Sequence, residues 1–208
     1  MNDALAVLQR LRDARPREPV RAGERCELCT EPIADEHGHL VDVEARRLLC
    51  ACRGCYLLFT PDGAGGEHYR AVPDRYLALT DVRLSAAQWD ALQIPVGVAF
   101  FFVNSTLARV AAFYPSPAGA TESLLPLDTW EELVGAHAAL STLQPDVEAL
   151  LVRADPDRAS GAECYLVPID SCYELVGHLR RLWRGFDGGR EAHGALDSFF
   201  DRVRARAG

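Results

Sequence analysis

The chain has 208 residues, 49 % of them hydrophobic and 25 % charged, which is enough apolar material for an ordinary globular core. Its net charge of −8 argues against a nucleic-acid partner, because general nucleic-acid binding depends on neutralising phosphates. The longest apolar run, residues 94–103, is far shorter than the roughly 20 residues of a membrane-spanning helix, and no signal peptide is recognisable, so we expect a cytoplasmic protein without membrane insertion.

The N-terminal part of the chain is predicted to hold one helix and then a small cysteine-rich unit. Leu5, Leu8 and Leu11 fall on one face of a helix over residues 3–14, and the prolines that follow end it. Residues 20–66 hold five of the seven cysteines. Within this unit we expect three short strands, at residues 39–43, 47–52 and 56–59, followed by a turn-rich loop at residues 61–66.

The region after residue 66 is predicted to hold helices and strands in the order α-β-β-α-β-β-α-α. Four helices are expected. The first begins at a capping box over 85–88, and the second lies near 128–142. The third begins at a second capping box over 171–174 and ends at Gly185, and the fourth runs through 192–203. The expected strands are 96–103, 109–114, 147–152 and 164–168, the first two forming a hairpin around 104–106.

Consecutive strands on short connections favour an antiparallel sheet with helices packed on one face. The predicted fold class is therefore α+β, with a small zinc-ribbon-like β unit followed by that sheet. The predicted organisation is an N-terminal helix, a metal-binding unit and an α+β domain, over residues 1–19, 20–66 and 67–208.

The most specific motif is a pair of Cys-x-x-Cys turns, separated by a segment of hairpin length. Each such turn points two sulfur atoms at one spot, and two facing turns complete a tetrahedral site with Zn–S distances of about 2.3 Å. The reducing cytoplasm disfavours disulfides. We therefore predict that one structural Zn2+ is bound by Cys26, Cys29, Cys52 and Cys55.

Two alternatives concern the ligands and the metal. Cys50 lies two residues before Cys52, so both side chains would face the same way on a strand, and Cys50 could replace Cys52. Four thiolates also hold a single Fe ion in rubredoxin-like sites. Such sites usually carry a small residue after the second cysteine of each turn, whereas Thr30 and Tyr56 follow here, so zinc is favoured.

Other polar residues give weaker signals. His37 and His39 lie between the cysteine pairs and make a mixed cysteine–histidine site conceivable, but we interpret them as turn and strand residues. The segment from Ser116 to Glu122 carries hydroxyl and N–H groups that could bind a small ligand, and we interpret it as a rigid proline-rich loop. The remaining cysteines, Cys164 and Cys172, are interpreted as small buried hydrophobic residues.

Catalysis has no positive sign in the sequence. No Ser-His-Asp order and no pair of carboxylates stands out. An HNH-type nuclease also has cysteine pairs around a histidine, but it needs a basic DNA-binding face, which this acidic chain does not clearly provide. We therefore expect a non-enzymatic protein.

Several runs of the chain resemble an uncharacterised bacterial family whose genes stand beside those of high-affinity nickel–iron hydrogenases, chiefly in actinobacteria. The resemblance covers roughly residues 24–203 and is carried by all five N-terminal cysteines and by Ile94-Pro-Val-Gly97, Phe113-Tyr-Pro-Ser-Pro-Ala-Gly119, Pro145-Asp-Val-Glu148 and Trp183-Arg-Gly-Phe186. It implies an accessory role, with a hydrogenase subunit or maturation factor as protein partner, and brings no catalytic residues. The leading hypothesis is a zinc-binding accessory protein, and the alternative is a rubredoxin-like electron carrier serving the hydrogenase.

Overall fold

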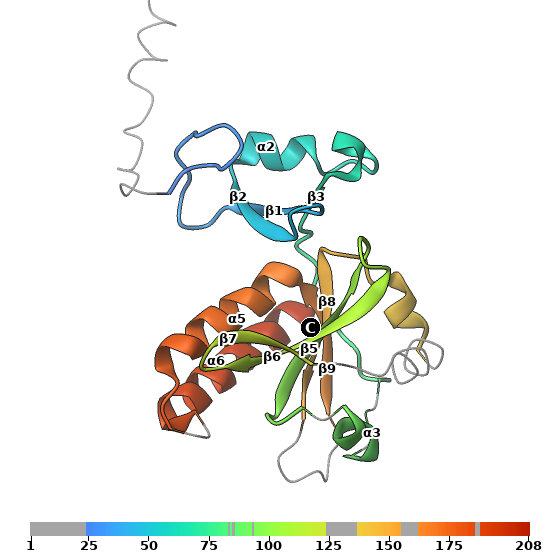
Figure 1. The fold of residues 1–208 in the computed structure, drawn as a ribbon, viewed down its shortest axis with the longest axis vertical. Coiled ribbons are helices and arrows are strands. Elements are labelled where there is room, and N and C mark those ends of the chain that lie inside the picture. Colours follow the sequence, from blue (N-terminus) through green and yellow to red (C-terminus); the bar gives the residue numbers. More distant parts are fainter. Residues whose placement is uncertain are drawn as a thin grey trace, which may run out of the picture.

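The computed structural model describes residues 24–82, 84, 86–92, 94–123, 137–154, 162–185 and 188–208. The helix predicted over 3–14 and most of the helix predicted near 128–142 lie outside these residues. The described chain forms two antiparallel sheets with helices around them, which confirms the α+β fold class (Figure 1).

The small sheet has three strands in the order β2-β1-β3. They are β1 (Gly38–Asp42), β2 (Arg47–Ala51) and β3 (Tyr69–Ala71), and the chain between β2 and β3 forms helix α2 (Arg53–Leu58) and the 3-10 helix η1 (Ala64–Glu67). The first two predicted strands are confirmed to within a residue. The sheet extends past residue 66, because β3 pairs with β1.

The strand predicted at residues 56–59 is wrong, because α2 occupies most of this segment. The side chain of Cys52 caps the helix by accepting the N–H of Cys55, at an N···S distance of 3.4 Å. Tyr56 then packs over Gly38 of β1, where a Cβ atom would come within 2.6 Å of the ring. The cap and this packing outweigh the strand preference of an apolar run that is too short to show a periodicity.

The large sheet has six antiparallel strands in the order β4-β9-β8-β5-β6-β7. They are β4 (Leu77–Ala78), β5 (Val98–Asn104), β6 (Arg109–Ser116), β7 (Gly119–Ser123), β8 (Glu148–Arg153) and β9 (Glu163–Pro168). The predicted hairpin around 104–106 and the two later strands are confirmed.

The segment from Ser116 to Glu122, predicted to be a loop, is instead the β6–β7 hairpin. Ser116 pairs with Gly119, and Tyr114 and Phe113 pair with the residues of β7 that follow. Gly119 adopts a φ of 116°, a conformation open to glycine, so the chain reverses within two residues. The segment is therefore a tight hairpin turn rather than an extended loop.

Helices lie on both faces of the large sheet. The long helices α5 (Ile169–Leu182) and α6 (Gly189–Ala207) pack against each other on one face, as predicted (Figure 1). On the other face lie α3 (Ala86–Ala91) and the 3-10 helix η2 (Ala138–Thr142). Among the residues that the structure describes, no helix combines the length and the apolar character needed to cross a membrane.

Helix α5 begins at Ile169, so the capping box predicted over 171–174 is wrong. Ser171 lies inside the helix, and its hydroxyl oxygen is 2.5 Å from that of Tyr76. The helix follows β9 directly, with Pro168 at the N-cap, so the sheet rather than a polar cap sets its start. It ends before Gly185, whose φ of 67° agrees with the predicted stop.

Cys164 and Cys172 lie in the two cores of the large domain, as predicted, with exposures of 5 % and 0 %. Burial raises the pKa of Cys164 to about 12 and raises the pKa of Cys172 well above its ordinary value. Because the thiolate is the reactive form, we expect neither thiol to react with iodoacetamide at neutral pH until the protein is denatured. Mass spectrometry of the alkylated peptides measures this, and labelling of either cysteine in the folded protein would be the opposite result.

Candidate metal centre

The first cysteine pair lies in a tight turn ahead of β1. The N–H of Cys26 donates to the carbonyl of Glu31, and the N–H of Thr30 donates to the carbonyl of Cys26, both at 2.8 Å. Thr30 adopts a left-handed conformation with a φ of 64°, which turns the chain back directly after Cys29. Cys26 is buried and Cys29 is exposed, so the turn holds one sulfur inside the small unit and one at its surface.

The second pair lies where β2 ends and α2 begins. Cys52 is the N-cap of α2, and Cys55 lies in its first turn. The N–H of Tyr56 donates to the carbonyl of Cys52 at 2.9 Å, which closes this turn. Because β2 ends at Ala51, Cys52 no longer follows the alternation of the strand. Cys50, in contrast, remains within the strand.

The structure brings the two pairs together. The Sγ atoms of Cys26, Cys29, Cys52 and Cys55 all lie within 4.8 Å of one another, and those of Cys29 and Cys52 are 3.6 Å apart. Tetrahedral coordination with Zn–S bonds of about 2.3 Å places neighbouring sulfur atoms about 3.8 Å apart, whereas a disulfide brings them to about 2.05 Å. The four free thiols therefore have the spacing of a tetrahedral site and could hold one metal ion.

The pKa values of two of the thiols, Cys26 and Cys55, are shifted in opposite directions. Burial raises the pKa of Cys26, but hydrogen bonds from the backbone N–H groups of Cys52, Cys29 and Leu28 outweigh it and lower the pKa to about 6. Burial and hydrogen bonds with the neighbouring thiols raise the pKa of Cys55. One thiol thus ionises readily, while another resists because burial and its hydrogen bonds with the neighbouring thiols favour the neutral form. A bound cation would favour the thiolate form of its cysteine ligands, because metal ligands must be deprotonated.

Cys50 lies outside this group. It pairs with His39 across β2 and β1. Its Sγ atom belongs to a second cluster with ring nitrogens of His37 and His39, in which the three ligating atoms lie within 4.8 Å of one another. The four-cysteine cluster is therefore formed without Cys50, and the two histidines interpreted as turn and strand residues lie beside its thiol.

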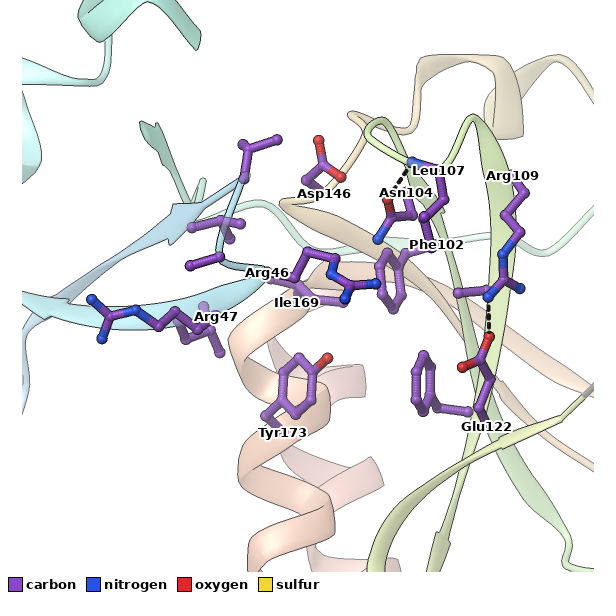
Figure 2. Close-up of a pocket in the computed structure, with 16 residues that line it drawn as sticks. Arg46, Arg47, Phe102, Asn104, Leu107, Arg109, Glu122, Asp146, Ile169 and Tyr173 are labelled. Atoms are coloured by element: carbon purple, nitrogen blue, oxygen red, sulfur yellow. Dashed lines mark hydrogen bonds and ion pairs between the residues drawn. The ribbon is translucent and has the colours of Figure 1, made fainter. Parts of the chain in front are cut away.

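A pocket of about 530 Å³ lies between the β1–β2 hairpin and the large sheet. Figure 2 shows Arg46 extending from the hairpin toward the pocket and Tyr173 reaching in from α5, with Arg109 and Glu122 on the opposite wall. Sequence reasoning missed this pocket, because its walls come from segments that are far apart in the chain.

The charges around the pocket are mostly paired. Arg109 bonds Glu122 at 2.6 Å, and Asp146 accepts the N–H and the hydroxyl of Ser105 at 2.9 and 2.5 Å. Arg46 has no ion-pair partner within the described part of the chain, and its φ of 53° is uncommon for a residue with a side chain. Among the described residues, the pocket thus offers apolar walls and the unpaired guanidinium group of Arg46, which suits a ligand with an apolar body and a negative charge.

Comparison with known proteins adds one finding at the level of the family. No curated protein and no solved structure is significantly similar to the chain. The model of a family of unknown function, DUF5947, matches residues 25–207, a span that includes both cysteine pairs and both sheets. The chain therefore belongs to the DUF5947 family of unknown function.

Proposed function

We propose that this protein is a non-enzymatic accessory protein in which Cys26, Cys29, Cys52 and Cys55 hold one structural zinc ion. The observation that carries the proposal is the convergence of the four sulfur atoms. A site filled by four protein ligands has no open position for a substrate, which is typical of structural zinc. The ion would tie the two turns together and order the small unit, whose described buried cluster has only five residues.

An exposed apolar edge beside the cysteines supports a role in protein interaction. Leu57 and Leu58 of α2 are 50 % and 68 % exposed and follow Cys55 closely. Single exposed leucines are common on protein surfaces, but two adjacent ones on a helix that begins at the metal ligands offer a fixed apolar contact. We infer that the partner docks on this edge of α2.

The proposed partner is a subunit or maturation factor of a nickel–iron hydrogenase in the cytoplasm. The family resemblance supports this, since genes of the family stand beside those of such hydrogenases. Affinity purification of the tagged protein from the producing organism is expected to recover hydrogenase components. Leu58→Glu should lose them and keep the metal, while the control Leu77→Glu, at a leucine 40 % exposed in β4, should keep both. Absence of hydrogenase components together with normal hydrogen uptake after gene deletion would refute the partner.

A second candidate is a rubredoxin-like single-iron electron carrier serving the same hydrogenase. The exposure of Cys29 favours it, because an exposed ligand places the metal at the surface where a redox partner docks. Elemental analysis of protein from the producing organism separates the two candidates. One zinc and no visible absorption supports the structural role, whereas one iron with visible absorption supports the electron carrier.

A further inference from the structure

A second group of metal-ligating side chains lies where the small sheet meets α5. His39 and Cys50 are directly paired across β1 and β2, so their side chains share one face of the sheet. His37 precedes β1, and its ring centroid is 4.8 Å from that of His39. One ligating atom from each of the three lies within 4.8 Å of the others. Figure 1 shows α2 on one side of this sheet and α5 on the other.

Hydrogen bonds define which ring nitrogens are available to a ligand. Nδ1 of His37 lies 2.9 Å from the carbonyl oxygen of Ala34, and because a carbonyl only accepts, this nitrogen carries the hydrogen. Nδ1 of His39 lies 2.8 Å from Oδ2 of Asp170, which accepts in the same way. In the neutral rings both Nε2 atoms therefore present a lone pair. Histidines that bind metals typically donate their other N–H to a carbonyl or a carboxylate in this manner.

An unpartnered nitrogen gives independent support. Nε2 of His37 is buried and has no hydrogen-bond partner among the described residues. Buried polar atoms nearly always have a partner, and a bound ion is one of the explanations for an exception. Two imidazoles and one thiolate form a donor set that suits late first-row ions such as Zn2+, Co2+, Ni2+ and Cu2+.

We propose that His37, His39 and Cys50 bind a second transition-metal ion, with Asp170 holding the ring of His39. Three protein ligands leave the fourth coordination position to water or to an exogenous ligand, unlike the four-cysteine centre. Asp170 lies on α5, 131 residues from His39, so the second site joins the small unit to the large domain. The proposal does not depend on which metal fills the four-cysteine centre.

Titration of the metal-free full chain with Co2+, followed by native mass spectrometry, counts the ions. The wild-type protein is expected to bind two, and Cys50→Ser and His37→Ala are expected to bind one each. The matched control His178→Ala, at an exposed histidine of α5, is expected to bind two. A wild-type chain that saturates with one ion, or a Cys50→Ser chain that still binds two, overturns the proposal.

The variant Asp170→Asn provides a second test of the proposed site, which remains usable if the variants of Cys50 and His37 fail to fold. Loss of the supporting carboxylate is expected to weaken binding of the second ion about 10–100-fold and to leave the first ion unaffected. Circular dichroism verifies that the variant is folded. If this variant binds both ions as tightly as the wild-type chain, the second site is wrongly assigned.

Discussion

Replacing Cys26 by serine is expected to release the ion of the four-cysteine centre and to unfold the small unit, while the large sheet stays folded. A serine hydroxyl does not replace a thiolate ligand, and Cys26 is 1 % exposed within the small unit. Structural zinc contributes roughly 10–16 kcal/mol to the folding of small zinc units, far more than the few buried side chains of this unit supply. The large sheet keeps its own buried clusters on both faces.

Elemental analysis measures the metal, and hydrogen exchange locates the unfolding. Protection is expected to disappear from β1 and β2 and to persist in β5 and β8. The matched control Cys164→Ala removes a buried thiol of the large domain and should keep the full metal content. The structural role of the metal would be disproved if Cys26→Ser kept both the ion at this centre and the protection of β1 and β2.

Replacing Arg75 by alanine is expected to lower the free energy of unfolding by about 3 kcal/mol, because it leaves the carboxylate of Glu148 buried without its cation. Glu148 is fully buried, and its oxygens accept Nε and Nη2 of Arg75 at 2.7 and 2.6 Å and the N–H of Gln144 at 2.8 Å. The hydrogen bonds that Arg75 donates to Glu148 raise the pKa of Arg75. The Arg75 side chain is 38 % exposed, so solvent screens part of the attraction and we expect the lower end of the range for buried pairs.

Urea unfolding followed by tryptophan fluorescence measures this effect. The double variant Arg75→Leu, Glu148→Leu is expected to recover most of the lost stability, because it removes the charge that Arg75→Ala leaves unpaired. Arg202→Ala is the control: it breaks the ion pair with Glu174, in which both side chains are more than half exposed, and should have a much smaller effect. Equal loss in the single and the double variant would show that packing, not the charge, sets the cost.

The four-cysteine cluster could be predicted from the sequence because its geometry is local. Each Cys-x-x-Cys spacing places two sulfur atoms in one turn, and only the hairpin of β1 and β2 is needed to bring the turns together. The absence of Cys50 from this cluster was harder to predict from the sequence. It depends on the end of β2 at Ala51, one residue before Cys52, and strand ends are the least certain part of a sequence-based prediction.

The wrong predictions share one physical cause: the conformation of a short segment depends more on its contacts in the fold than on its own sequence preference. Residues 56–59 form a helical turn because Cys52 caps it and Tyr56 packs on Gly38. Residues 116–122 form a hairpin because β7 pairs with β6. Residues 171–174 do not cap a helix, because β9 leads directly into α5, which begins at Ile169. In each case a contact from another element outweighed the local preference.

The α+β class, the antiparallel strands of the large sheet and the four-cysteine cluster could all be predicted from the sequence, because periodicity and fixed spacing act over a few neighbouring residues. Three features became visible only in the folded chain: the pairing of β3 with β1, the pocket lined by Arg46 and the contact of His39 with Asp170. These features join segments that are distant in the chain. No local pattern encodes them, since each forms only when segments distant in the chain come together: β1 and β3 within the small sheet, and the small unit and the large domain at the pocket and at Asp170.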